Sequence, residues 1–407
     1  MLIPIISLIS LLAAIVIGYV RRINIGLVGI ALAFFIGNFL VDMPSVQIVG
    51  GWPLRLFFML LGMMLLFGIA GANGTLPLIA RRVVALTGGR TRLIPPVFFL
   101  LAGILAAMGP GNISTCALLL PIAMAISSVH NISPLLMATM VISGANAGGL
   151  SPIAPTGIIG VTLSRELGLD IGMRVFSKQI IGQSIFATTL YFLLGGHRLS
   201  SGPLVQRTRI EPFTRMHHLT MGVLLLVVLA IIFGRWDIGM TAFSGTVILL
   251  LLGAADEKSV FQGAPWSTLI LVCGMGVLVH VSEQAGGIDL LTRILARFMN
   301  VHTAGPIMAV IGGVLSIVSS ASGVVMPTLI PTVPGLAAEV GGDPASIIAA
   351  IIMGAHVVTN SPISTLGALA ISSAGRNVDR NLLFRNMLLV GICGLGYAAL
   401  IVFLGLV

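Results

Sequence analysis

Charge is what this chain has least of, since only 8% of its 407 residues are charged. Soluble domains carry roughly 25% charged residues, so the composition excludes a soluble enzyme. Acids number 12 against 21 lysines and arginines, and the net charge of +9 could suggest a nucleic-acid partner. The arginines, however, lie in short loops beside apolar runs, where such charges orient membrane spans. We therefore expect no nucleic-acid partner.

Cysteine is also scarce. Cys116, Cys273 and Cys393 lie inside apolar runs without a CxxC or His/Cys metal spacing, so we interpret them as packing thiols. The chain also lacks a Walker motif, which excludes direct use of ATP. A G-x-S-x-G elbow with a plausible histidine and acid is missing too, which excludes a serine hydrolase. The sequence thus predicts neither an enzyme nor a bound cofactor.

Apolar sequence is abundant, at 57% of the residues. Runs of about 20 residues, long enough to cross a bilayer, recur from residue 2 to the end of the sequence. No polar interval is long enough for a separate globular domain. The first run lacks the positive region and cleavage site of a signal peptide, so we interpret it as a transmembrane helix. The sequence predicts an all-α polytopic protein of the cell inner (plasma) membrane.

The second half of the chain resembles the first, which divides the sequence into halves 1–205 and 206–407. Within 93–157, adding 210 to the residue number gives a gap-free match that aligns Pro96 with Pro306, Pro121 with Pro331, Gly144 with Gly354, Ser151 with Ser361 and Gly157 with Gly367. Upstream the offset is slightly larger, and it aligns Ile25 with Ile238, Gly62 with Gly274 and Gly74 with Gly286.

Each half is predicted to cross the membrane an odd number of times. A re-entrant hairpin adds no crossing, and its backbone is tolerated at membrane depth only where protein or water satisfies it. Five crossings per half place the second half upside down relative to the first, as an inverted repeat. In half one we expect spans at about 2–20, 23–41, 53–72 and 177–195, an interfacial helix near 71–92, hairpin arms at 93–108 and 114–129, and a broken helix over 133–163.

The positive charges orient this topology. Both termini are predicted to lie outside, the first hairpin to open from the cytoplasm and the second, near 319–323, from outside. Residues 197–218 then form the cytoplasmic linker. Of the 21 lysines and arginines, 14 fall on one side of the membrane in this topology, and that side is cytoplasmic by the positive-inside rule. The outer side has the other seven, which are Arg55, Arg165, Arg174, Lys178, Arg235, Arg293 and Arg297.

Inverted repeats with interrupted helices indicate a transporter whose site lies where the interruptions meet. At a break, the helix N-terminus has unpaired N–H groups, which suit a carboxylate, and the helix C-terminus has unpaired carbonyl groups, which suit a small cation. Single polar residues in membrane helices are often packing contacts, but here they cluster at the breaks. They are Asn112, Ser114 and Thr115, then Asn146 and Ser151, then Ser319, Ser320 and Ser322, and finally His356, Thr359, Asn360, Ser361 and Ser364.

Acids are missing from the predicted interior. All 12 fall at span ends or in connections. Proton relays normally bury at least one acid, so the pattern favours sodium over protons as coupling ion. His356 is the exception, because it lies mid-membrane and could bind substrate or carry a proton. Two alternatives stay open: a proton-coupled or antiporting carrier of another anion, and an anion channel.

Two motifs carry a resemblance to known carriers. Residues 109–115 (GPGNIST) with Pro121 resemble the Ser-Asn-Thr hairpin motif of the divalent anion/sodium symporters, and residues 148–153 resemble their Gly-Gly-x-x-Thr-Pro stretch. Residues 67–75 (FGIAGANGT) and 140–153 are more similar still to the MatC-type malonate/dicarboxylate carriers of the ion transporter superfamily. The second half departs, with Ala321, Ser322 and Gly323 at the second motif.

The resemblance implies a homodimer that takes up a dicarboxylate with sodium by an elevator movement. By position it implies a first sodium site at Gly111, Asn112 and Gly149 and a second at Ser320, Ser322 and Asn360. The substrate contacts that we expect are Asn112, Ser114, Thr115, Asn146, Ser151, Pro152, Ser322, Gly323, His356 and Ser361.

Overall fold

The computed structural model describes residues 2–85, 90–199, 211–375 and 378–407. Every regular element in these residues is a helix. Nine helices of the described chain are long and apolar enough to cross a membrane. The predicted all-α polytopic architecture is therefore confirmed. The boundary at 205–206 and the side assignments of Arg207, Arg209 and Arg376 lie outside the described residues.

The first half begins and ends its helices close to the predicted positions. Its elements are α1 (Leu2–Arg21), α2 (Ile25–Leu40), α3 (Ser45–Gly50), α4 (Leu54–Ala72), α5 (Thr75–Ala85), η1 (Thr91–Leu93), α6 (Ile94–Met108), α7 (Gly111–His130), α8 (Pro134–Gly149), α9 (Pro155–Glu166), α10 (Gly172–Leu193) and η2 (Gly196–Arg198). Prolines lie at or next to the first position of α6, α8 and α9. Proline lacks a backbone N–H, and at a helix start this group would have no partner within the helix, so proline suits that position.

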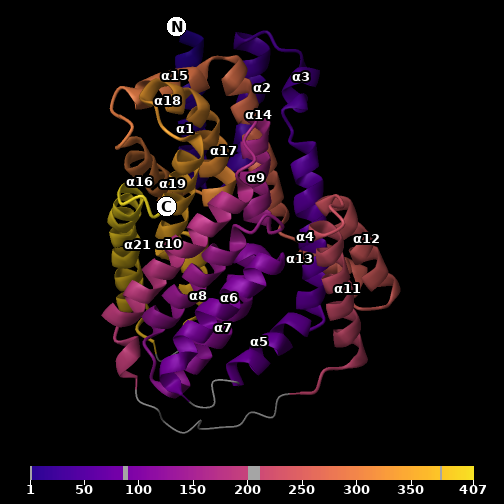
Figure 1. Cartoon of the computed structure of the whole chain (residues 1–407). Coiled ribbons are helices and arrows are strands. Elements are labelled where there is room, and N and C mark those ends of the chain that lie inside the picture. The colour runs from indigo at the N-terminus through magenta and orange to yellow at the C-terminus, as the bar shows by residue number, and fades with distance from the viewer. Residues whose placement is uncertain (1, 86–89, 200–210, 376–377) are drawn as a thin grey trace.

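The second half repeats this order. Its elements are α11 (Arg215–Ile232), α12 (Ile238–Leu251), α13 (Glu257–Gly263), α14 (Trp266–Gln284), α15 (Gly287–Ala296), α16 (Ala304–Val318), η3 (Ala321–Val325), α17 (Met326–Leu329), η4 (Ile330–Thr332), α18 (Val333–Val340), α19 (Pro344–Val357), η5 (Val358–Asn360), α20 (Thr365–Ser373) and α21 (Arg380–Phe403). Helix α16 is the counterpart of α6, and α14 is the counterpart of α4. Figure 1 shows α5 and its counterpart α15 near opposite ends of the molecule.

The returning arm of the second hairpin differs from its counterpart. Helix α7 is continuous, whereas residues 321–340 divide into a π-helical turn and three short helices. Residues 327, 331 and 334 are prolines, while α7 contains only Pro121. Each proline removes a backbone donor and crowds the preceding turn, so this arm is segmented.

The tightest packing is repeated in both halves. Helix α6 packs on α8, and α16 packs on α19. A side chain at Gly144 would collide with the carbonyl oxygen of Phe99, and one at Gly354 would collide with that of Ala309. These two glycines, and the two residues that they meet, correspond to each other in the sequence repeat. Glycine thus lets the first hairpin arm and the broken helix approach closely in each half.

The outer helices of the two halves interlock. Helix α2 packs on α14 and α12 packs on α4. A side chain at Gly274 would meet the backbone of Gly26, and one at Gly62 would meet the carbonyl of Gly239 at 2.8 Å. Each of these two contacts therefore joins one helix of the first half to one helix of the second half, and the two contacts correspond to each other in the repeat.

We expect Gly354→Val to destabilise the protein, because the added side chain would force α19 away from the Ala309 carbonyl. Overpacking of this kind costs about 1–3 kcal/mol. Thermal unfolding in detergent measures the change. Gly396→Val is the matched control, since nothing lies within 4 Å of a side chain at that position of α21. Equal melting temperatures for the two variants would contradict the prediction.

Candidate functional site

The tip of the first hairpin depends on glycine. Helix α6 ends at Met108, and Gly109 and Gly111 have φ values of +143° and +73°, which side chains other than glycine rarely adopt. The chain therefore turns within Gly109 and Pro110 and begins α7. Asn112 follows at once, only 8% exposed, and its Oδ1 accepts a hydrogen bond from the Ile113 N–H at 3.0 Å.

The hairpin tip rests on the first broken helix. Helix α8 ends at Gly149, and a side chain there would lie 3.1 Å from Asn112 Cβ. Gly111 lies against Pro155, the first residue of α9. Within the break, the Ser151 N–H donates to the Gly148 carbonyl at 2.9 Å. The structure thus brings together Gly111, Asn112 and Gly149, the three residues predicted for the first sodium site.

A central polar cluster of Asn112, Asn146, His356 and Thr359 joins the two halves. Asn112 Nδ2 donates to Asn146 Oδ1 at 3.0 Å. Asn146 Nδ2 donates to the His356 carbonyl at 3.0 Å and to Thr359 Oγ1 at 2.8 Å. Asn146 is fully buried, and both of its amide hydrogens are used. It holds the first hairpin against both broken helices.

The second break is closed by its own serines. Ser364 Oγ lies 2.6 Å from the Thr359 carbonyl oxygen and 2.8 Å from the Ser361 carbonyl oxygen, either of which can accept its proton. It accepts from the Gly367 N–H at 3.3 Å, which caps α20. Ser361 is buried and lies against Gly391 of α21. Asn360 Nδ2 donates to the Val357 carbonyl at 3.1 Å. Its Oδ1 is buried without a hydrogen-bond partner in the part of the chain that the structure describes.

His356 presents a free acceptor at this break. Its Nδ1 lies 2.8 Å from the Ile352 carbonyl oxygen. Because a carbonyl only accepts, Nδ1 carries a proton, and in the neutral ring Nε2 then carries a lone pair. Nε2 is buried and has no partner among the described residues, and the same is true of Thr115 Oγ1 at the first hairpin. Two buried groups beside the breaks are therefore available to a ligand.

The second hairpin is arranged differently. Ser320 Oγ accepts from the Gly323 N–H at 3.1 Å, which fixes the start of η3. Ser322 is 8% exposed in that turn, and η3 packs on α19. Gly323, a predicted substrate contact, lies against Leu271 of α14. Ser322 and Gly323 of the second hairpin thus lie in a turn that packs on both α19 and α14.

Two cavities approach the breaks. The larger has a volume of about 1530 Å³ and reaches Ser151 and Pro152 at the first break. Its mouth carries both signs of charge, including the pairs of Arg55 with Asp237 and Arg165 with Asp170. The smaller has a volume of about 130 Å³ and is lined by Ser114, Thr115 and Phe67. One cavity therefore reaches the first break, and a separate one reaches the first hairpin.

Sequence reasoning missed Thr156. Its Oγ1 donates to Asn112 Oδ1 at 3.3 Å, and its side chain is buried. It follows Pro155 at the start of α9, a position next to the break that could have marked it. Gln179 and Gln183 of α10 are also fully buried, and Gln179 donates to the Ala349 carbonyl at 3.0 Å.

Interrupted helices around an uncharged polar cluster define the class of protein as a membrane carrier. Residues 1–149 match the family described as the dicarboxylate carrier protein MatC N-terminus. This match supports the MatC-type resemblance over these residues and points to a transporter of dicarboxylates rather than an enzyme. No curated protein matches the chain.

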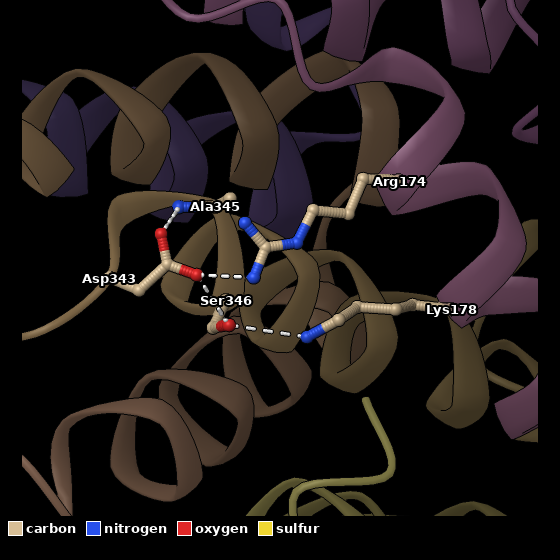
Figure 2. A network of polar contacts seen from close by, with 5 residues as sticks. All are labelled: Arg174, Lys178, Asp343, Ala345 and Ser346. Carbon is tan, nitrogen blue, oxygen red and sulfur yellow. Dashed lines mark hydrogen bonds and ion pairs between the residues drawn. The ribbon is translucent and has the colours of Figure 1, made fainter.

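A charged network ties α10 of the first half to the start of α19 in the second half. Asp343 accepts hydrogen bonds from Arg174 at 2.6 Å, from Ser346 Oγ at 2.9 Å and from the Ala345 N–H at 3.2 Å (Figure 2). Lys178 donates to Ser346 at 3.2 Å. Burial opposes ionisation of Asp343, but the Ser346 and Ala345 hydrogen bonds and the Arg174 charge outweigh it, so the pKa of Asp343 lies below its usual value.

We expect Asp343→Asn to lower the melting temperature in detergent at neutral pH. A carboxylate whose folded pKa is depressed stabilises the fold above its unfolded pKa of about 3.9, and this contribution is lost as pH falls through the folded pKa. The difference from the wild type should therefore shrink below about pH 4. Glu339→Gln, at an exposed position on the preceding helix, is the control. If the difference in melting temperature between Asp343→Asn and the wild type does not change with pH, the Asp343 charge does not stabilise the fold.

Proposed function

We propose that the protein is a secondary active transporter that imports a small dicarboxylate, of the malonate or C4 type, together with sodium. The central polar cluster is the observation that carries this proposal. It places uncharged acceptors between a hairpin and two broken helices, and the family match supports dicarboxylates as the substrate class.

The dicarboxylate is held by hydroxyls and helix ends. Helices α9 and α20 begin at the breaks, so their first N–H groups point their partial positive charge toward the site. Ser151 and Pro152 face the larger cavity, where a substrate can reach them. Arg and Lys side chains are not needed for this mode of anion binding, which suits a site at membrane depth.

Sodium is coordinated by oxygen atoms near the first hairpin. Gly111, Asn112 and Gly149 lie in contact, and they bring an amide oxygen and the carbonyl end of α8 together. Carbonyl and amide oxygens are suitable ligands for a small hard cation. The second sodium ion binds near Ser320, Ser322 and Asn360, where Asn360 Oδ1 has no partner among the described residues.

Transport uses an elevator movement within an inverted repeat of 1–205 and 206–407. The moving block comprises α6–α10 and α16–α21, and the frame comprises α1–α5 and α11–α15. The matching element order, the repeated glycine contacts and the opposite placement of α5 and α15 in Figure 1 support this division. The homodimer and the outer position of both termini stay predictions from the resemblance and the charge pattern.

The proposal is tested by uptake of radiolabelled malonate or succinate into proteoliposomes with an inward sodium gradient. We expect concentrative uptake that is lost when potassium or choline replaces sodium at constant pH. In the same assay Asn112→Ala should abolish uptake. The substitution removes the amide oxygen proposed to bind sodium and the amide nitrogen that donates to Asn146 in the central polar cluster. Asn381→Ala, at an exposed position on α21, is the matched control.

Unchanged uptake without sodium would refute the coupling, and wild-type uptake by Asn112→Ala would refute the site. Flux that only equilibrates the substrate would instead indicate an anion channel.

A proton-coupled carrier of an anion is the second candidate, because His356 Nε2 is a buried acceptor with no partner among the described residues. If His356 carries the coupled proton, His356→Asn abolishes uptake driven by a pH gradient, since an amide cannot accept a proton near neutral pH. The pH profile of uptake by the wild type and the variant is the measurement. Retained uptake with an unchanged profile would eliminate this candidate.

A further inference from the structure

One face of α19 leads from the start of the helix to the second break. Ser346, Ala349, Met353 and His356 follow one another at intervals of three, four and three residues. These intervals place them on the same side of the helix. At a rise of about 1.5 Å per residue, the face extends roughly 15 Å into the protein from Ser346 to His356.

Helix α10 packs along this face and supplies polar side chains to it. Lys178 Nζ donates to Ser346 Oγ at 3.2 Å (Figure 2). Gln179 Nε2 donates to the Ala349 carbonyl at 3.0 Å, and Gln183 follows one helical turn further along α10. Both glutamines are fully buried. We call this contact, from Lys178 to His356, the α10–α19 seam.

Each glutamine leaves one oxygen unpaired. Gln179 Nε2 faces a carbonyl, which only accepts, so the orientation of this amide is fixed and Oε1 is a free acceptor. Gln183 Nε2 reaches only the sulfur of Met353, a weak acceptor, at 3.9 Å. Both Oε1 atoms are buried without a hydrogen-bond partner among the described residues. Buried polar atoms nearly always have a partner, so the seam calls for hydrogen-bond donors.

His356 adds a third acceptor at the inner end of the seam. Its Nδ1 contact with the Ile352 carbonyl draws the ring back over the preceding turn, which is the turn of Met353 beside Gln183. In the neutral ring Nε2 accepts, and it has no partner in the described part of the chain. Three buried acceptors therefore follow one another along the seam.

The other half does not repeat this run of amides. Helix α8 has Thr139, Ser143 and Asn146 at the positions that correspond to Ala349, Met353 and His356. The counterpart of α10 is α21, however, and its residues 387–396 contain neither an amide nor a charged side chain. A run of buried amides thus leads to the central polar cluster from one end of the molecule, the end that holds Asp343.

Few ionisable side chains lie on the elements that pack on α19. Arg174 and Lys178 join Asp343 and Ser346 at the outer end of the seam. Tyr397 Oη donates to the carbonyl of Gly182, next to Gln183. The others on these elements are Tyr191, Glu339, Arg380, Arg385 and Cys393. Within the described residues, no hydrogen bond or ion pair joins any of these groups to His356. A proton that reaches His356 therefore comes from water.

We propose that the α10–α19 seam is a proton-access path, in which water molecules connect the end of the molecule at Asp343 with His356. These waters donate to the two glutamine oxygens and to Nε2, and buried waters commonly make about three such hydrogen bonds. A proton passes inward from water to water, and the last water gives it to Nε2. The imidazolium that forms carries one positive charge and donates from both nitrogens, and release of the proton reverses the step.

The charge pattern predicts that this end of the molecule lies outside, so His356 would exchange its proton with the outer solution. The inference goes beyond the proposed transport of a dicarboxylate with sodium, because it holds whether or not the proton is coupled to transport.

Deuterium exchange at the histidine ring carbon between the two nitrogens tests the path. This exchange requires a protonated ring and a base from water, and mass spectrometry of peptides from protein held in D₂O resolves individual histidines. We expect His356 to take up deuterium in the folded wild type although its side chain is fully buried. Gln183→Leu and Gln179→Leu should each slow the exchange at His356 at least tenfold and leave that of the exposed His302 unchanged.

Ser316→Ala is the matched control. Ser316 Oγ donates to the Ala355 carbonyl at 2.7 Å, so this variant loses a buried hydrogen bond next to His356 on the α16 side, outside the seam. We expect it to exchange like the wild type. Unfolding exposes the ring and speeds exchange, so a misfolded glutamine variant cannot imitate the expected slowing.

Three results would overturn the proposal: no exchange at His356 while His302 exchanges, an unchanged rate in both glutamine variants, or equal slowing in Ser316→Ala. The measurement uses neither sodium nor a dicarboxylate. If uptake fails but the exchange pattern holds, the proposed transport function is wrong and the path stands. If the exchange pattern fails but uptake with sodium is observed, the path is wrong and the proposed function stands.

Discussion

Broken helices in an apolar surrounding impose the requirement on which the rest of this structure depends. Each break leaves backbone N–H and carbonyl groups that neither lipid nor apolar side chains can satisfy. The protein meets this requirement with small residues: Ser364 caps α20, Ser151 closes the first break through its backbone, and Asn146 ties one break to the other. The polar residues therefore gather at the breaks, and Gly144 and Gly354 of the broken helices allow the hairpin arms to pack closely beside them.

Much of this arrangement could be predicted from the sequence. Glycine and proline interrupt long apolar runs at residues 109–111 and 148–155, and helices cannot continue through them, so the breaks and most helix ends were predictable. The internal repeat located the corresponding breaks of the second half. Asn112 and Gly149 were expected together, and the structure places them in contact.

The remaining features depend on side-chain geometry that one sequence does not specify. Asn146 was expected to bind substrate, but both of its amide hydrogens are used by His356 and Thr359. Gly323 lies against Leu271 of α14, and Ser361 lies against Gly391 of α21, which are contacts between distant parts of the chain. The role of Thr156 depends on a contact across 44 residues, which no local pattern reveals.

The uncharged character of the central polar cluster has an electrical consequence. Asn112, Asn146 and Thr359 carry no formal charge, and His356 carries none when Nδ1 is its only protonated nitrogen. A membrane potential exerts work on charge that crosses the low-dielectric layer, at about 2.3 kcal/mol per elementary charge per 100 mV. If the protein moves as the proposed elevator, its empty site crosses that field without carrying a binding-site charge. The voltage would then act mainly on the ions and the anion that it carries.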